Sequence, residues 1–229
     1  MQRPRVVLSW SSGKDSAWAL HRLRELDEVD VVALLTTVNE TFDRVAMHGV
    51  RRELLEEQAK QVDLPLFDVL IPWPCSNEDY ERAIECSIKE LIASFDITHV
   101  AFGDLYLEDI RAYRETKMQA LKIKPLFPLW GLDTEILAKD MIAAGLKAKI
   151  TCIDPGIIPA SLAGRTFDED FLNELAADID PCGENGEFHT FVYAGPMFKQ
   201  SIAIEAGEVV ERENFIFADF KIPDTLRTQ

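Results

Sequence analysis

Six small or charged residues near the start of the chain have the composition of a phosphate-binding loop. The segment follows a short apolar run and reads Ser11-Ser12-Gly13-Lys14-Asp15-Ser16. Small residues let the backbone curl tightly, so that its N–H groups can point at an anion. The N-terminus of the helix expected next adds a partial positive charge. We therefore expect Ser11 and Ser16 to offer hydroxyl groups, and Lys14 to act as a mobile cation, beside a bound phosphate.

Two other interpretations of this loop are open on its residues alone. A Walker A loop would need a glycine five residues before Gly13, but Leu8 stands there. A plain helix start, with serine or aspartate side chains capping the first turn, would need no ligand at all. The segments further along the chain must decide between a nucleotide site and a simple helix cap.

The elements that would position this loop alternate along the first half of the chain, which predicts an α/β fold with a parallel sheet. Strands are expected at residues 5–10, 29–36, 66–71 and 99–102. Helices are expected at residues 15–26, 47–62, 80–95 and 110–121. Parallel sheets bind ligands at the carboxyl ends of their strands. Chemistry is therefore expected just after Trp10, Thr36 and Phe102.

The second half changes its pattern, which predicts a smaller α+β domain. A proline-interrupted crossover is expected at residues 125–130, and Gly145 is expected to end a helix. Helices are expected at residues 134–144 and 168–179, and strands at residues 146–153, 190–193, 201–204 and 208–220. We predict a nucleotide-binding domain over residues 1–125 and an acceptor-binding domain over residues 126–229.

Composition narrows the function classes. The 229 residues are 47% hydrophobic and 28% charged, which is typical of a globular domain with an ample core. A net charge of −16 argues against a nucleic acid partner, because such a surface repels phosphates. No apolar run approaches the roughly 20 residues that a membrane helix needs. Four widely spaced cysteines argue against a zinc site or a disulfide framework and favour a reducing cytoplasm.

Five later segments give the loop a context. They are Thr36-Thr37-Val38-Asn39, Met47-His48-Gly49-Val50, Phe102-Gly103-Asp104-Leu105, Pro125-Leu126-Phe127-Pro128-Leu129-Trp130 and Cys182-Gly183-Glu184-Asn185-Gly186-Glu187-Phe188-His189-Thr190-Phe191. In this order, after the first loop, they resemble the diphthine–ammonia ligase family. That family is a branch of the PP-loop ATP pyrophosphatases, whose loop pattern is SGGxDS. Ser12 departs from that pattern, because it stands where the first glycine usually falls.

The resemblance implies a PP-loop, HUP-like nucleotide-binding domain and an ATP-dependent, AMP-forming ligase. ATP would be cleaved to AMP and pyrophosphate with Mg²⁺, and the adenylated carboxylate would then react with ammonia. In the best-known members the carboxylate is that of diphthine, a modified histidine of elongation factor 2. The implied ATP-binding residues are Ser11, Ser12, Gly13, Lys14, Asp15, Ser16, Thr36, Thr37, His48 and Gly103. Catalysis would fall to Lys14, Asp104, Glu184 and Glu187, with Asp104 also as metal ligand, and acceptor binding to Arg111, Asn185 and His189.

Several alternatives stay open. The family's eukaryotic-type members carry Tyr-Gln-Arg-x-Arg after the Gly-Asp segment; here Arg111 matches the first arginine, but the second falls one position late, at Arg114. The acceptor could therefore be a small metabolite carboxylate, above all in a bacterium, since bacteria make no diphthamide. A tRNA-modifying PP-loop enzyme and a nucleotide sensor without turnover are the other candidates. Asp104 could simply cap a helix, and His48 could be structural. The assembly state is open, a homodimer included.

Overall fold

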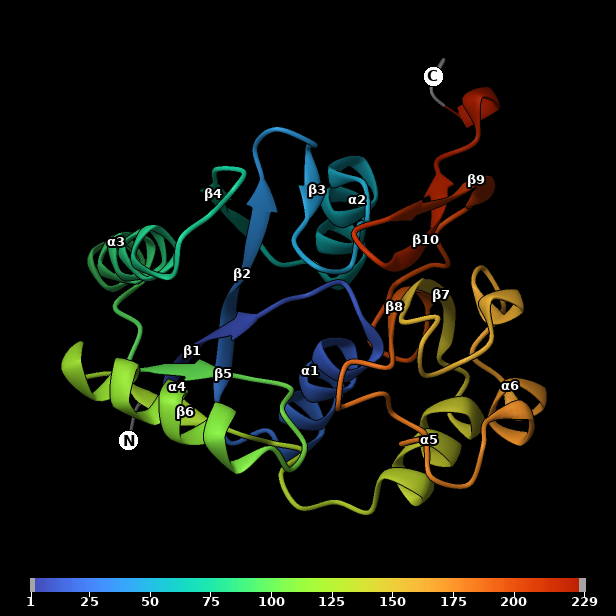
Figure 1. Ribbon diagram of the computed structural model, residues 1–229. Coiled ribbons are helices and arrows are strands. Elements are labelled where there is room, and N and C mark those ends of the chain that lie inside the picture. The colour runs from blue at the N-terminus through green and yellow to red at the C-terminus, as the bar shows by residue number, and fades with distance from the viewer. Residues whose placement is uncertain (1–2, 227–229) are drawn as a thin grey trace.

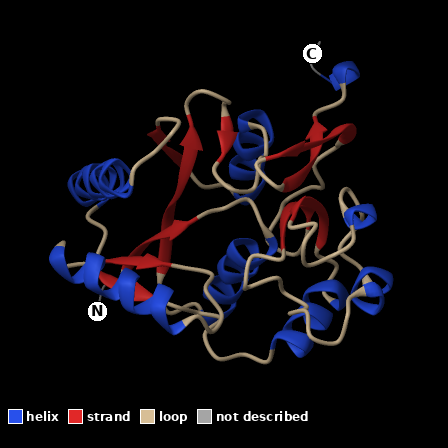
Figure 2. Cartoon of the chain, viewed as in Figure 1, coloured by secondary structure: helices blue, strands red, loops and turns tan. Residues whose placement is uncertain are grey.

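The computed structural model describes residues 3–226 and contains two β-sheets with helices packed around them (Figures 1 and 2). The first sheet is built on β1, β2, β5, β6 and β4, all parallel, with the short antiparallel strand β3 at the end of β2. Its strands are β1 (Arg5–Ser9), β2 (Asp30–Asn39), β3 (Arg44–Val45), β4 (Leu66–Ile71), β5 (His99–Ala101) and β6 (Lys124–Leu126). β1 lies between β2 and β5, so the loop after β1 leaves the sheet where the chain order reverses.

Four helices connect these strands and cover both faces of the sheet. They are α1 (Lys14–Leu26), α2 (Arg52–Val62), α3 (Asn77–Phe95) and α4 (Glu108–Ala120). Apolar residues of α1 and α2 pack in one hydrophobic core, and those of α3 and α4 pack in another. Figure 1 shows α3 on the left of the sheet, α4 across its lower end and α1 on its right. α3 begins where the Ser76 hydroxyl accepts a hydrogen bond from the Asp79 N–H, a side-chain cap of its first turn.

The second sheet is antiparallel, with the order β8-β7-β10-β9. Its elements, with the helices beside it, are α5 (Thr134–Ala143), β7 (Lys147–Ile153), η1 (Ala160–Leu162), α6 (Glu169–Glu174), β8 (Phe188–Ala194), β9 (Glu205–Arg212), β10 (Phe215–Lys221) and η2 (Asp224–Leu226). The hydrophobic core around α1 continues into this sheet through Phe188 and Phe191. Arg44 and Arg51 also form ion pairs with Asp219 of β10, at 2.8 and 2.6 Å. The two sheets therefore share one hydrophobic core and are also joined by these ion pairs.

Most expected elements are confirmed, and β4 has the predicted bounds. The helix expected at residues 47–62 begins only at Arg52, because Met47 and Gly49 have φ of 63° and 67°, outside helical geometry. The helix expected at residues 168–179 is reduced to Glu169–Glu174, and no strand forms at residues 201–204. The strand expected at residues 208–220 is a hairpin that turns at Glu213 and Asn214.

The boundary between the predicted domains falls inside an element. Residues 125 and 126 both belong to β6, whose Leu126 carbonyl accepts a hydrogen bond from Phe102 of the first sheet at 2.9 Å. The first sheet thus ends one residue beyond the predicted division, and the two-domain assignment stays a prediction. Across residues 3–226, the helices are all too short or too polar to pass through a membrane.

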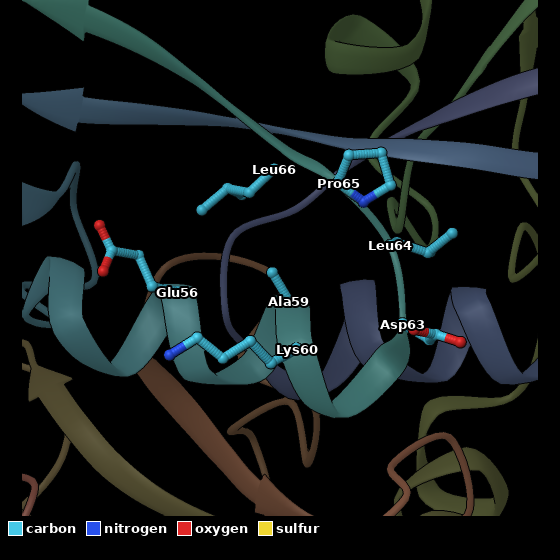
Figure 3. Close-up of a pocket in the computed structure, with 7 residues that line it drawn as sticks. All are labelled: Glu56, Ala59, Lys60, Asp63, Leu64, Pro65 and Leu66. Carbon is cyan, nitrogen blue, oxygen red and sulfur yellow. The ribbon is translucent and has the colours of Figure 1, made fainter. Parts of the chain in front are cut away.

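One surface hollow of the structure, about 380 Å³, lies where α2 ends and β4 begins (Figure 3). Its lining mixes the charged side chains of Glu56, Lys60 and Asp63 with a short apolar run that ends at Leu66. None of the side chains predicted to bind or act on a nucleotide lies there. The candidate site must therefore be sought at the carboxyl ends of the strands.

Candidate active site

The phosphate loop joins β1 to α1 and is held by hydrogen bonds among its own residues. The Ser11 and Ser16 hydroxyls lie 3.2 Å apart, and the Ser16 hydroxyl donates to the Gly13 carbonyl at 3.0 Å. Ser12 has φ of 69°, in the left-handed region that favours glycine. That conformation accounts for the glycine that the related pattern has at this position. The loop therefore has the expected tight curl, although Ser12 reaches it with an unfavoured backbone.

The second sheet contacts the loop directly. The Thr190 hydroxyl of β8 accepts a hydrogen bond from the Lys14 N–H at 3.0 Å, in the first turn of α1. The Thr190 carbonyl lies 3.1 Å from Nδ1 of His48, whose ring is tilted by 36° against that of His189, with centroids 4.6 Å apart. Burial lowers the pKa of His48 to about 4 and that of His189 well below its ordinary value, so both are neutral at pH 7. The predicted nucleotide histidine and acceptor histidine thus meet at one place, beside Gly13.

Gln58 of α2 joins three parts of this site, and sequence reasoning missed it. Its side chain is fully buried. Its amide oxygen accepts from the Trp10 indole N–H at 2.8 Å. Its amide nitrogen donates to the carbonyls of Ser12 at 3.0 Å and Val192 at 2.6 Å. The end of β1, the phosphate loop and β8 are therefore tied together by one buried amide, which sequence alone would place only on an amphipathic helix.

Replacing Gln58 by leucine should lower the free energy of unfolding by about 3 kcal/mol, because it leaves a buried indole N–H and a buried carbonyl unpaired. Urea unfolding measures this change. Gln61→Leu is the matched control, since Gln61 lies one turn later on α2 and bonds to the more exposed Glu57 and Gln200. Equal losses in the two variants would contradict the role assigned to Gln58.

Lys14 is not the mobile cation expected from the sequence. Its side chain is 2% exposed, and its ammonium donates to the Asp15 carboxylate at 2.9 Å and to the Cys182 carbonyl. The ammonium also lies 5.3 Å from the centre of the Phe188 ring and 5.7 Å from that of Phe167. Burial by itself lowers the pKa of Lys14, but the nearby Asp15 carboxylate raises it more. The net pKa lies above its ordinary value, so the ammonium stays charged. Lys14 therefore connects α1 to the segment that carries Glu184.

Gly103, directly after β5, packs against the start of α1. A Cβ atom at this position would lie 2.9 to 3.1 Å from the backbone of Asp15 and Ser16. Contacts that short force the neighbouring backbone to move. The glycine in the Gly-Asp segment is therefore explained by close packing on the phosphate loop.

We expect Gly103→Ala to weaken ATP binding by about 100-fold, because the added methyl displaces the loop proposed to hold the phosphates. Isothermal titration with ATP measures the change. Gly156→Ala is the control, since its added methyl meets only the movable Asp154 side chain, at 3.1 Å. A folded Gly103→Ala protein that binds ATP normally would show that this packing does not shape the loop.

Asp104 lies beside the loop but is already paired. Arg114 of α4 binds it in a two-point ion pair, with Nε 2.6 Å from Oδ2 and Nη2 3.0 Å from Oδ1. The Arg114 guanidinium also lies 4.4 Å from the centre of the Phe102 ring. The interpretation of Asp104 as a plain helix cap finds no support, since α4 begins after Leu107 without a side-chain cap. Arg114, which stands one position later than the second arginine of the family pattern, is thus the arginine that contacts Asp104.

Glu184 bonds to the segment after β5 and to Asp180 of its own segment. Its Oε1 accepts a hydrogen bond from the Leu105 N–H at 2.7 Å, and its own N–H donates to Asp180 at 2.7 Å. Burial raises the pKa of Glu184 to about 7; the Leu105 hydrogen bond opposes this shift, and the nearby Asp15 and Asp104 carboxylates add to it. A carboxyl group that titrates near neutral pH can accept and release a proton during a reaction.

A second carboxylate is buried behind Glu184. Glu187 is 3% exposed, and its Oε1 accepts from the Asn185 side chain at 3.0 Å. Its Oε2 is buried and has no hydrogen-bond partner within residues 3–226. Tyr106 lies beside this cluster. Burial, and next the Asp180 charge, raise its pKa to about 12, while a hydrogen bond with Asn185 acts in the opposite direction. Asp180 and Tyr106 carry no motif of their own, so only the fold reveals them.

Three predicted residues lie further from this centre. Arg111 stacks on Trp130 at 4.6 Å and on Phe127 at 4.9 Å, and pairs with Glu115 at 2.8 Å. The Thr36 hydroxyl is buried and donates to the Trp10 carbonyl at 2.7 Å. The Thr37 carbonyl accepts from Ala46, beside β3. These contacts leave the proposed adenine and acceptor roles of the three residues as predictions.

A divalent cation would find carboxylates here but no complete cage. No three histidine, cysteine, aspartate or glutamate side chains gather to hold a metal in the part of the chain that the structure describes. Mg²⁺ needs only one or two protein carboxylates when a nucleotide supplies further oxygens. The Oδ1 atom of Asp15 is buried and has no hydrogen-bond partner within residues 3–226. Close packing of Gly103 on the Asp15 backbone brings the segment that carries Asp104 next to it. The residues present fit a metal that arrives with a triphosphate.

Comparison with known proteins decides the family. The diphthamide synthase N-terminal domain model matches residues 4–125, and the diphthamide synthase C-terminal domain model matches residues 133–222. The chain belongs to the diphthamide synthase family. Within it, the diphthine–ammonia ligase of Homo sapiens is 29% identical over 236 residues, which span 93% of this chain and 88% of the human protein. The Mus musculus ligase is 26% identical over 235 residues, with the same coverage.

A third relative shows how family members differ in length. The diphthine–ammonia ligase of Schizosaccharomyces pombe is 29% identical over 222 residues, which span 89% of this chain but 36% of the yeast protein. Membership of the diphthamide synthase family makes this chain an ATP-dependent enzyme that forms a carbon–nitrogen bond. The site described above lies where the two family domains meet, since the Lys14 N–H donates to the Thr190 hydroxyl and the Lys14 ammonium donates to the Cys182 carbonyl.

Proposed function

We propose that this enzyme activates a carboxylate with ATP and amidates it with ammonia. The carboxylate oxygen attacks the α-phosphate, which forms an acyl-adenylate and releases pyrophosphate. Ammonia then attacks the acyl carbon, which forms the amide and releases AMP. The observation that carries this proposal is the convergence of three segments: the phosphate loop, the Gly103–Asp104 segment and the Glu184 segment, linked by Lys14 and Leu105.

Each segment would take one task in this reaction. The loop N–H groups and the N-terminus of α1 would hold the phosphates that leave as pyrophosphate. Mg²⁺ bound with the nucleotide would neutralise charge at the phosphates, and Asp15 and Asp104 would hold it. Glu184, with its pKa of about 7, would take the proton that ammonium must lose before nitrogen attacks. Glu187, with one oxygen unpaired, would help to hold that cation.

Two classes of acceptor carboxylate are compatible with this proposal. The names of the relatives point to diphthine, the substrate after which those ligases are called. Arg111, by contrast, sits stacked on aromatic rings, and Arg114 takes the position at Asp104. This departure from the Tyr-Gln-Arg-x-Arg pattern supports a small metabolite carboxylate as the second candidate.

The test incubates the enzyme with ATP, Mg²⁺, ammonium and candidate carboxylates, and separates the nucleotide products. We expect AMP and pyrophosphate in equal amounts, and amide only when ammonium is present. Formation of ADP instead would refute adenylation. ATP binding without turnover of any acceptor would favour a nucleotide sensor, and a tRNA requirement would favour a tRNA-modifying enzyme. Hydroxylamine, which traps acyl-adenylates as hydroxamates, gives an independent readout of the first step.

A further inference from the structure

A cavity of about 220 Å³ lies between α3 and α4, on the face of the first sheet opposite α1. Its floor comes from β2 and β5 through Leu35 and Val100. Ile84 and Ile88 of α3 and Met118 of α4 form its walls. This apolar part of the lining accepts an apolar group, since buried polar atoms would find few partners there, and the charged side chains of Glu81, Glu85 and Lys117 complete the lining. Its volume exceeds the roughly 150 Å³ at which an apolar cavity can hold benzene.

The cavity adjoins the candidate active site. Ser9, which lines it, is the last residue of β1 and pairs with Leu35 in the sheet, two positions before Ser11 begins the phosphate loop. Phe102, which also lines it, directly precedes Gly103 and Asp104. A molecule in the cavity would therefore have one end at the carboxyl edge of β1 and β5, where the reaction must occur.

Arg114 stands between the cavity and the reacting groups. It lines the cavity, lies over the Phe102 ring and forms its two-point ion pair with Asp104. A guanidinium has five N–H donors, and Asp104 accepts a hydrogen bond from one of them, at Nη2. The remaining donors suit a second carboxylate, for which the planar fork of arginine is the best protein partner.

We propose that this cavity binds the body of the acceptor, a small carboxylic acid with an aromatic ring or a branched aliphatic group, and that Arg114 binds its carboxylate. The assignment rests on the proposed function and names its substrate class. An adenine ring is the competing occupant. Its ring nitrogens and amino group need several hydrogen bonds, whereas the inner wall is apolar. The polar lining residues are Ser9, Tyr80, Glu81, Glu85, Tyr113, Arg114 and Lys117. Of these, Tyr113 and Lys117 already bond to Glu81, at 3.3 and 2.8 Å.

The first test measures binding without turnover. ¹⁹F NMR follows 3-(4-fluorophenyl)propanoate titrated into the full-length protein and into Ile84→Phe, whose larger ring fills the cavity. We expect binding to the native protein and at least about tenfold weaker binding to the variant. Ile92→Phe is the control, because Ile92 is a half-buried isoleucine of the same helix that does not line the cavity. Arg114→Met should weaken the probe as well, without affecting its neutral amide.

The second test uses pyrophosphate release with saturating ATP and ammonium. Native enzyme should use 3-phenylpropanoate or 4-methylpentanoate with a KM about tenfold or more below that of acetate, and Ile84→Phe should remove this preference while the KM for ATP stays constant. Displacement of the fluorinated probe by AMP in competition would assign the cavity to adenine and overturn the proposal. So would equal probe binding by Ile84→Phe, Ile92→Phe and native protein.

Failure of this inference and failure of the proposed function give different results. If some carboxylate yields AMP and pyrophosphate but filling the cavity leaves its KM unchanged, the cavity assignment falls and the ligase proposal stands. If the probe binds in the cavity but no carboxylate yields AMP, adenylation is refuted and the cavity is not an acceptor site.

Discussion

Replacing Lys14 by alanine should lower the free energy of unfolding by about 3 kcal/mol and abolish amide formation. The ammonium is buried, and its removal leaves the Cys182 carbonyl and the Asp15 carboxylate without it. We take the lower part of the range for broken buried ion pairs because the Asp15 side chain is 28% exposed, so that water can replace part of the lost contact. Urea unfolding and an amide assay on the purified protein measure the two effects.

A second variant separates the two roles that Lys14 could have. Lys14→Met keeps an unbranched chain against Phe167 and Phe188 but removes the charge. If Lys14 positions the Glu184 segment, ATP affinity should change by no more than about threefold while amide formation falls by about 100-fold. If Lys14 instead binds phosphate, as the sequence suggested, ATP affinity should fall with activity. Lys149→Ala is the control, because Lys149 is a partly buried lysine whose ammonium donates to the Thr166 hydroxyl at 2.9 Å.

The fold was largely predictable because its strongest signals are local. β4 is an apolar run between clear breaks, and α3 has a serine cap and a long amphipathic repeat. The errors fall where tertiary contacts decide. β3 has two residues and exists only through its pairing with β2, and β6 contains Pro125, which favours a loop when read alone. The hairpin turn at Asn214 interrupts a stretch whose apolar residues look continuous in one dimension.

The candidate site was predictable as a list of residues but not as a geometry. The expected strand ends pointed to the phosphate loop and Gly103, and the family resemblance added Glu184; in the structure, Gly103 packs on the loop and Glu184 bonds to Leu105. The sequence could not show that the Lys14 side chain turns away from solvent toward Cys182, because the two residues are 168 positions apart in the chain. Gln58 and Arg114 lie on amphipathic helices, where periodicity marks a buried face without saying what a polar residue on it will bind.

These contacts also suggest how the two halves of the reaction are coordinated. The phosphate loop is not an isolated feature of the first sheet: β8 supplies Thr190 to its first helical turn, and Gln58 bonds to both Ser12 and Val192. A nucleotide that shifted the loop would therefore also shift β8. Because Glu184 precedes β8 by a few residues, nucleotide binding and placement of the proposed base are mechanically connected.

Glu184→Gln should lower the rate of amide formation by about 1,000-fold, because the amide keeps the Leu105 hydrogen bond but cannot accept a proton. If Glu184 is the base, its carboxylate is the active form in the native enzyme. With its pKa at about 7, activity should rise as pH increases through neutrality and then level off. The variant should lack this rise. Rates measured from pH 5.5 to 8.5 check it. At the alkaline end of this range hydroxamate formation should fall far less, since hydroxylamine is already unprotonated there.

Stability gives a readout of the same group that does not depend on catalysis. The pKa of Glu184 is raised in the folded state, so between about pH 4.5 and 7 the folded protein holds a proton that the unfolded chain releases. Native stability should therefore decline through that window as pH rises, and Glu184→Gln should show a smaller decline. Glu174→Gln, which removes an exposed partner of Arg165, should leave both the pH profile and this slope unchanged. A native-like pH–rate profile in Glu184→Gln would exclude Glu184 as the base and turn attention to Glu187, the other buried carboxylate of the same segment.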